Sequence, residues 1–496
     1  MSIIRIPLVF LAACLAAPSS LASSQPEPPT ARALVTTAAD RMGGEAKLRA
    51  IHGLRIETTG YRNLLEQSER PDGPWIPQWE QSVEYWDLDG PAWDANLTLR
   101  AGGEYTMREV MAGGIAARQF GDRWLPATSA QVEHAEDWLS LTPPRVLTLA
   151  LDAPDLRLES DVPYQGTAQH VVSFAWQGTR VRVLLSARTG FLTAAEVTRA
   201  YPDDPFLAVW GDVPTRVSVS YWERLDDGLF FPKQWDVELL GRPHRAVTLT
   251  AFEANPAFPE GTFAIPAAQR AAFRSAPGLD APVLGSPRQP AMDLADGVVH
   301  VPGSWAITFV RQADGLVVLE APISSGYSAA VLDEAARRFP GVPVKAVVST
   351  SDAWPHIGGV REYAARGIPL YVLDLNVAQV QRALGSPHTL HPDALERAPR
   401  AADLRPVKDR VVIGDGPNRI ELYPLRGETG ERSMLAYLPG HRLLYADDMI
   451  QMGRNGPPEY AWEVAEAVRR NGLAVDTVFA MHTLPTPWAN IMKIFE

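Results

Sequence analysis

Hydrophobic and polar residues alternate along most of the chain between residues 54 and 254. A period of two is typical of strands that bury one face, and turn residues separate the alternating stretches at nearly regular intervals. The pattern therefore predicts a large antiparallel sheet or half-barrel. The predicted strands are 54–61, 78–88, 96–99, 104–111, 114–120, 156–164, 168–176, 179–186, 191–199, 215–222, 228–239 and 245–254.

The segments on either side of these strands have different patterns. Apolar residues recur at helical spacing over residues 31–51, with Gly43-Gly44 as an interruption. Residues 268–292 are rich in Ala, Pro, Gly and Ser, which is the composition of a linker. We therefore expect a helix followed by the β-rich region in one domain, residues 31–267, with the linker at its end.

From residue 293 onward, the pattern becomes one of strands that alternate with helices. Three apolar or alternating stretches precede a helical stretch at 327–339, and the buried strand at 344–348 is followed by a helix at 360–365. This alternation is typical of layered α/β organisation. We assign residues 293–496 to a second domain.

Composition narrows the class of protein. The chain has 496 residues, which favours two or three domains, and its hydrophobic fraction of 46% is ordinary for a globular protein. The formal net charge is −12, and no basic stripe with interleaved aromatic residues is present in the sequence. Both features argue against nucleic-acid binding.

The N-terminus has the order of a secretory signal. Arg5 precedes an apolar run at residues 6–17, and Ser20-Leu21-Ala22 has the small residues of a cleavage site. We expect residues 1–22 to be removed, residues 23–30 to be a spacer and the protein to be periplasmic. The alternative is a lipobox at Leu11-Ala12-Ala13-Cys14, in which a lipidated Cys14 would anchor the protein to the outer membrane. Membrane attachment is expected only in that case.

Cysteine usage limits the chemistry of any metal site. Cys14 is the only cysteine, so the mature chain has neither a disulfide nor a thiolate ligand. His, Asp and Glu must then supply the ligands.

One stretch carries the candidate chemistry. Residues 348–359 read Val-Ser-Thr-Ser-Asp-Ala-Trp-Pro-His-Ile-Gly-Gly and lie between the buried strand and the next helix. A strand, a polar loop with His-x-Gly-Gly and a helix resemble the metal-binding loop of the metallo-β-lactamase-fold hydrolases, which usually reads Thr-His-x-His-x-Asp-His-x-Gly-Gly. His356 matches the last ligand of that loop. The slots of the two other histidines and of the Asp are occupied by Ser351, Ala353 and Pro355, which cannot bind a metal as those residues do.

Three further anchor points of the same family can be placed. The slot of a turn histidine falls on Thr429, and the carboxylate that bridges two metals falls on Asp448, with Asp447 as the fallback if the strand ends earlier. His482 follows an apolar stretch and resembles the histidine that completes the second metal site. The resemblance thus implies an αββα sandwich in which the ligands of one metal, His356, Asp448 and His482, are retained and those of the other are lost.

The retained residues have both a chemical and a structural interpretation. Two imidazoles and one carboxylate can hold one Zn²⁺, Mn²⁺ or Fe²⁺ with open positions, and a water molecule there could act as a nucleophile. No general base is evident, because Pro355 occupies the slot of the water-orienting Asp. Alternatively, His356 caps a helix, Asp448 holds a loop and His482 is a buried, satisfied histidine.

A weaker resemblance concerns residues 31–267. A helix that carries Met42-Gly43-Gly44, followed by a long meander that ends in Asn255-Pro256, is similar to the β half-barrels of lipoprotein-sorting proteins. That resemblance implies a concave face that holds an acyl chain; the alternative is a β-domain that simply packs on its neighbour.

Two functions follow from the sequence. The first is a hydrolase-like protein with an eroded dinuclear centre and one zinc ion at most, acting on an ester, lactone or phosphoester. The second is a non-catalytic envelope protein that binds a lipid or a protein partner through its β-domain. The predicted fold class is α+β in both cases.

Overall fold

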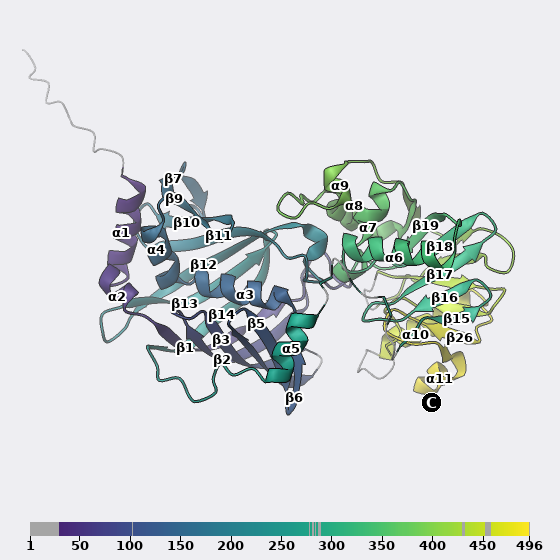
Figure 1. Ribbon diagram of the computed structural model, residues 1–496, viewed down its shortest axis with the longest axis horizontal. Coiled ribbons are helices and arrows are strands. Elements are labelled where there is room, and N and C mark those ends of the chain that lie inside the picture. The colour runs from purple at the N-terminus through teal and green to yellow at the C-terminus, as the bar shows by residue number, and fades with distance from the viewer. Residues whose placement is uncertain are drawn as a thin grey trace, which may run out of the picture.

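The computed structural model of the chain is a mixed α+β structure with three sheets (Figure 1). It describes residues 29–101, 103–276, 278–279, 282, 284–285, 289–428, 432–451 and 458–495. The expected signal segment, Cys14 and nearly all of the spacer lie outside these residues. No helix in the described ranges is long and apolar enough to cross a membrane.

The first sheet, here called the N-terminal sheet, has 14 strands in the order β6-β5-β4-β3-β2-β1-β14-β13-β12-β11-β10-β9-β7, with β8 paired to β9. Its neighbouring strands pair antiparallel, as the alternating pattern predicted. The bounds are β1 (Gly53–Asn63), β2 (Pro77–Asp87), β3 (Ala92–Arg100), β4 (Glu104–Ala112), β5 (Ile115–Phe120), β6 (Arg123–Pro126), β7 (Arg157–Leu158), β8 (Val162–Tyr164), β9 (Thr167–Trp176), β10 (Thr179–Ser186), β11 (Leu192–Ala200), β12 (Asp212–Arg224), β13 (Phe230–Leu239) and β14 (Arg242–Ala254).

Helices cover one face of this sheet. They are α1 (Ala31–Arg41), α2 (Glu45–Arg49), α3 (Ser129–Ser140) and α4 (Pro143–Asp152). The interruption between α1 and α2 is at Gly43 and Gly44, whose φ values of 120° and 99° favour glycine. The core between helices and sheet contains Trp86, Trp138 and Trp235, whose ring centroids lie 5.3–5.9 Å apart.

A helix lies in the range that the composition assigned to the linker. Helix α5 (Ala267–Ser275) packs against β5 and β6, where Phe273 contacts the cluster of Val110, Ile115 and Ile265. Its amphipathic spacing is short and is masked by the surrounding Ala, Pro and Ser residues. The composition of this range therefore did not reveal that its first part belongs to the packed structure.

The other two sheets form a sandwich. Their strand orders are β15-β16-β17-β18-β19-β20-β21 and β22-β23-β24-β25-β26-β27. The bounds are β15 (Met292–Ala295), β16 (Val298–Val301), β17 (Ile307–Gln312), β18 (Gly315–Leu319), β19 (Val344–Ser349), β20 (Leu370–Leu373), β21 (Leu404–Val407), β22 (Val411–Ile413), β23 (Ile420–Pro424), β24 (Met434–Leu438), β25 (Leu443–Tyr445), β26 (Thr477–Phe479) and β27 (Thr486–Pro487).

The sandwich has four layers. Side chains from both sheets share one cluster, to which Val317 and Val348 contribute from one sheet and Ala436 and Phe479 from the other. Helices α6 (Ser325–Arg338), α7 (Val360–Ala365), α8 (Val377–Gly385) and α9 (Ala394–Arg397) pack outside the seven-stranded sheet. Helices α10 (Pro458–Arg470) and α11 (Trp488–Met492) cover the six-stranded sheet (Figure 1).

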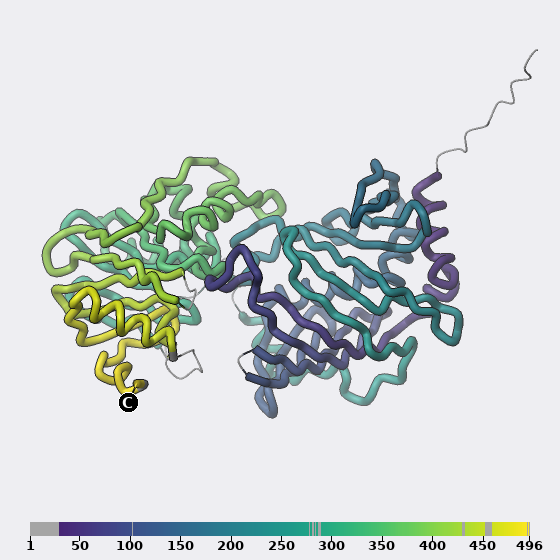
Figure 2. The backbone as a smooth tube through the Cα atoms, turned by 180° about the vertical axis from the view of Figure 1, so that it is seen from behind, coloured from purple at the N-terminus to yellow at the C-terminus, as the bar shows by residue number. Residues whose placement is uncertain are grey.

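A loop of the N-terminal sheet reaches the sandwich. Residues 64–76 connect β1 to β2, and Figure 2 shows this purple segment beside the green and yellow parts of the chain. Leu65 is buried in the same cluster as Trp210 and Trp354, whose rings meet edge to face at 5.1 Å. The loop thus brings residues from the first hundred positions to the sandwich segment around Trp354.

Candidate metal centre

The strand ends of the sandwich bring the candidate ligands together. His356 lies in the short helical turn Trp354–His356, which follows β19, while Asp447 and Asp448 follow β25 and His482 follows β26. Strands β25 and β26 are parallel neighbours, so their carboxyl ends lie at the same edge of the sheet. This is the edge at which open α/β sheets place their functional loops.

His356, Asp448 and His482 each offer a ligand atom, and these three atoms lie within 4.8 Å of one another. Nε2 of His356 is 4.0 Å from Oδ2 of Asp448, and Nε2 of His482 is 3.5 Å from Oδ1 of Asp448. Two ligand atoms that are each about 2 Å from one ion lie at most about 4 Å apart, so the two separations of 4.0 and 3.5 Å are compatible with a shared ion. The structure thus assembles the three residues that the sequence singled out, here called the outer group.

The remaining ligand slots contain no metal-binding side chain among the described residues. Ser351, Ala353 and Pro355 are buried, and the Ser351 hydroxyl accepts a hydrogen bond from the Ala353 N–H at 3.2 Å. The Pro355 carbonyl accepts one from the Ile323 N–H at 2.6 Å. Thr429, the fourth slot, lies outside the described residues.

Asp447, which the sequence offered only as the fallback for Asp448, also lies beside His356. Instead of substituting for Asp448, it lies on the other side of the His356 ring, with Oδ1 3.3 Å from Nδ1. Its φ of 51° is in the left-handed region that favours glycine. Both carboxylates of the Asp-Asp pair therefore contact His356, one on each nitrogen.

Glu320 is a site residue that the sequence reasoning missed. Glu320 directly follows β18 and is fully buried. Strand β18 runs parallel to β19, and β19 ends next to residues 350–359, here called the metal loop. Its ligand atom lies within 4.8 Å of those of His356 and Asp447, and these three residues are here called the inner group. A carboxylate immediately after a buried strand was the signal that could have found it.

Burial and neighbouring charges raise the pKa values of Glu320 and His356 in the inner group. Burial and the neighbouring Asp447 charge raise the pKa of Glu320 to about 8. Burial disfavours the His356 imidazolium, but the adjacent Asp447 carboxylate, with the charges of Asp448 and Glu320, outweighs burial and raises the pKa of His356 to about 10. A cation that bound here would have to displace these protons.

The 64–76 loop clamps the metal loop from outside the sandwich. The Ser68 hydroxyl donates to Oδ1 of Asp352 at 2.6 Å and accepts from the Arg432 N–H at 3.2 Å. The Glu66 carbonyl accepts from the Trp354 N–H at 3.1 Å. Ser68 and Asp352 are each only 1% exposed, and burial raises the pKa of Asp352 to about 6.

We expect Gly358→Ala to destabilise the metal loop strongly. A Cβ at this position would lie 2.1 Å from the Ile323 carbonyl oxygen, and backbone cannot yield to such a contact without moving the loop. Overpacking of this kind costs about 1–3 kcal/mol or more. Urea unfolding of the variant would measure the loss.

Gly385→Ala is the matched control, because a Cβ there meets no atom within 4 Å. Its free energy of unfolding should stay close to that of the parent chain. Equal stability of the two variants would show that the Gly358 backbone is not as closely packed as described.

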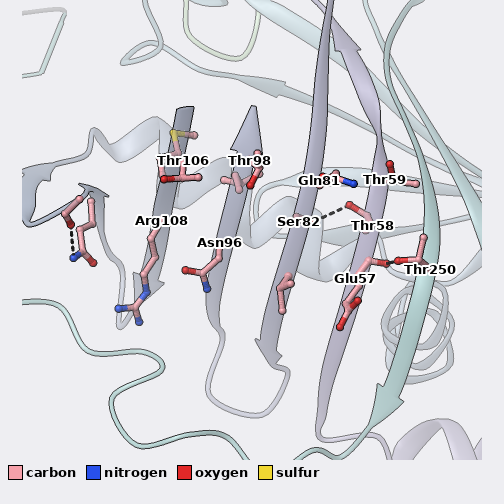
Figure 3. A pocket seen from close by; sticks show the side chains of 15 residues that line it. Glu57, Thr58, Thr59, Gln81, Ser82, Asn96, Thr98, Thr106, Arg108 and Thr250 are labelled. Carbon is pink, nitrogen blue, oxygen red and sulfur yellow. Dashed lines mark hydrogen bonds between the residues drawn. The ribbon is translucent and has the colours of Figure 1, made fainter. Parts of the chain in front are cut away.

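A surface depression lies elsewhere, on the N-terminal sheet. It has a volume of about 680 Å³ and is lined mainly by polar side chains, including Glu57, Gln81, Asn96 and Arg108 (Figure 3). Gln81 alternates with the core residue Trp86 along β2, so it faces away from the tryptophan cluster.

Comparison with known proteins gave similarity to solved structures only. No family model matches the chain, and no curated protein matches it. Among solved structures, the metallo-β-lactamase TMB-1 is 12% identical, with 41% of this chain and 94% of that chain covered at a TM-score of 0.33. A metallo-β-lactamase from Pontibacter korlensis is 13% identical, with 41% and 94% covered at a TM-score of 0.32. The sec-alkylsulfatase Pisa1 from Pseudomonas sp. is 15% identical, with 43% and 40% covered at a TM-score of 0.32.

Proposed function

We propose that the protein is a metal-dependent hydrolase of the metallo-β-lactamase fold whose reacting centre is the outer group of His356, Asp448 and His482. The convergence of their three ligand atoms within 4.8 Å supports the proposal. Two imidazoles and one carboxylate suit Zn²⁺, Mn²⁺ or Fe²⁺. Such an ion would supply a Lewis acid and lower the pKa of a water molecule.

The three residues of the outer group differ in how far their side chains are buried. The His356 ring is 2% exposed, with Nδ1 3.3 Å from Oδ1 of Asp447 and Nε2 4.0 Å from Oδ2 of Asp448 in the outer group. The Asp448 side chain is 27% exposed and that of His482 is 16% exposed, so a substrate would approach from their side. Asp448 is the one carboxylate of the two groups that solvent reaches, and we assign proton transfer to it because Pro355 cannot accept a proton.

An ester, a lactone or a phosphoester is the proposed substrate class, since each is cleaved by attack of an activated water on a polarised centre. The fold alone selects none of them. We further propose that residues 31–267 and 293–496 are separate domains, that the first is a half-barrel, and that residues 1–22 direct export to the periplasm. Lipidation of Cys14 is the alternative for the last point.

Metal content of the purified mature protein tests the proposal. After loading with Zn²⁺ or Mn²⁺ and removal of excess metal, we expect about one equivalent at the outer group, lost in both Asp448→Asn and His482→Gln. His441→Gln is the matched control, because His441 bonds Asn418 away from the strand ends that form this site. Loss of ester, lactone or phosphoester hydrolysis in the same two variants would support the assignment; metal content unchanged by both would overturn it.

The second candidate function is a non-catalytic envelope protein that binds a lipid or protein partner. The observation that favours it is the buried, donor-free packing of Ala353 and Pro355 in former ligand slots. On this view the sandwich is a scaffold, and no metal would be retained at the outer group. The metal measurement above therefore separates the two functions.

A further inference from the structure

Three buried polar atoms belong to the inner group, whose ligand atoms lie within 4.8 Å of one another. They are Oε2 of Glu320, Oδ1 of Asp447 and Nδ1 of His356, and none has a hydrogen-bond partner in the part of the chain that the structure describes. Nδ1 and Oδ1 are within ion-pair distance at 3.3 Å but lack hydrogen-bond geometry. The three side chains are at most 2% exposed, so water does not satisfy these atoms from the surface.

The other oxygen of each carboxylate is held in place. Both the N–H, at 3.3 Å, and the hydroxyl of Thr350 donate to Oε1 of Glu320, and the Ser433 hydroxyl donates to Oδ2 of Asp447. Each carboxylate therefore has one anchored oxygen and one oxygen without a hydrogen bond, and the buried Tyr445 hydroxyl near Glu320 also has none. Anchoring by neighbouring donors is the usual way in which proteins orient metal-binding carboxylates.

Backbone conformation contributes to this arrangement. Glu320 has a φ of 81° and Asp447 a φ of 51°, in the left-handed region that side chains other than glycine rarely adopt. Such conformations persist where the surrounding structure fixes them, and they cluster at functional sites. Both carboxylates are thus positioned by their backbones as well as by their donors.

The negative charges of Glu320 and Asp447 favour a bound cation. Neither Glu320 nor Asp447 has a lysine or arginine within ion-pair distance among the described residues, and the one basic group near both is His356. Two carboxylates in a closed, water-poor space are costly unless they are protonated or neutralised. A divalent ion between them would neutralise both and would satisfy all three open atoms.

We propose that Glu320, Asp447 and Nδ1 of His356 form an inner cation site, separate from the outer group that uses Nε2 of the same ring. Two carboxylate oxygens and one imidazole favour Mn²⁺, Fe²⁺ or Zn²⁺. With both groups filled, His356 would release the N–H protons of both ring nitrogens to solvent, so that each nitrogen could hold one ion. The inner site does not depend on the outer one and persists if the proposed hydrolysis is absent.

Metal titration of full-length mature protein with Mn²⁺ and with Zn²⁺ separates the two sites. Parent protein should bind two equivalents, Glu320→Gln one at the outer group and His482→Gln one at the inner site. Glu320→Gln keeps the shape of the side chain and removes its charge. Glu334→Gln, on the surface of α6 and paired only with arginines, is the control and should bind as the parent does.

Each pattern of results has one meaning. If Glu320→Gln binds no metal while His482→Gln keeps one equivalent, the inner site stands and the proposed hydrolase centre fails. If Glu320→Gln binds as much metal as the parent and His482→Gln binds none, only protons occupy the inner group. That result would overturn the inner site and leave the hydrolase proposal standing.

A measurement on unaltered protein removes dependence on the folding of the variants. In crystals of the parent chain soaked in Mn²⁺, an anomalous peak should appear between Glu320 and Asp447 at about 2.0–2.2 Å from their open oxygens. Density for water or no density at that point, with Mn²⁺ bound elsewhere or nowhere in the crystal, would refute the inner site.

Discussion

His356→Ala is expected to abolish metal binding, because His356 is the one residue that belongs to both the outer and the inner group. Changes in residues that merely orient a ligand cost about 10–100-fold in metal affinity, so we expect at least about a 100-fold loss when the ligand itself is removed. The loss should exceed that of either single-group variant. Isothermal titration with Zn²⁺ and elemental analysis after dialysis would measure it.

The control for this variant is His52→Ala, which removes an exposed histidine whose side chain is 62% exposed beside Asp89. It should keep the metal content of the parent. Because His356 is buried, circular dichroism must show that the His356 variant still folds. Retention of bound metal in folded His356→Ala would contradict both groups.

Arg361→Ala is expected to lower the free energy of unfolding by about 3–5 kcal/mol, the usual cost of leaving one partner of a buried ion pair alone. The Arg361 side chain is 2% exposed on α7, and its Nε and Nη2 donate to the two oxygens of Asp393 at 2.6 and 3.0 Å. Its Nη1 donates to the carbonyls of Leu384 and Ser386 at 2.7 and 3.0 Å. Urea unfolding at neutral pH would measure the loss.

Arg366→Ala is the matched control, because its side chain is 53% exposed and pairs with Glu362 one helical turn away. Exposed pairs of this kind contribute about 0.3–0.5 kcal/mol. Similar losses in the two variants would show that the Arg361 pair is no more important than a surface pair.

The Arg361 pair also predicts how stability changes with pH. Burial alone would raise the pKa of Asp393, but the hydrogen bonds of Arg361 and of the Glu396 N–H, with the Arg361 charge, lower it to about 2. The folded-state pKa is therefore below the unfolded value of about 3.9. Its contribution is present above about pH 4 and is lost as the pH falls toward about 2, and Arg361→Ala should flatten this part of the curve.

The β1–β2 loop, residues 64–76, joins the N-terminal sheet to the part of the sandwich that contains the candidate metal centre. Its residues Glu66 and Ser68 bond Trp354 and Asp352, which lie within the metal loop itself. The Tyr460 hydroxyl on α10 donates to Glu69 of the same loop. The N-terminal sheet thus contributes to the position of the metal loop, whichever ligand it holds.

The sequence by itself predicted most of the elements and the three residues of the outer group. Alternation of polar and apolar residues depends on which face of a strand is buried, so it is visible locally, and it predicted the antiparallel strands of the N-terminal sheet. The switch to strands and helices after residue 293 predicted the layered part. His356, Asp448 and His482 were selected because each matches an anchor point of the metallo-β-lactamase-fold loop pattern near the end of an apolar strand.

Only the tertiary structure decided what surrounds those ligands. Ser68 and Asp352 are 284 positions apart, and Glu320 and Asp447 are far from each other in the sequence, so no local pattern links them. The order in which the strands pair and the left-handed backbone at Glu320 and Asp447 bring these side chains to His356. The outer group could be predicted because its residues lie near the ends of predicted strands. The inner group and the contacts of the 64–76 loop form only where segments that are distant in the sequence meet.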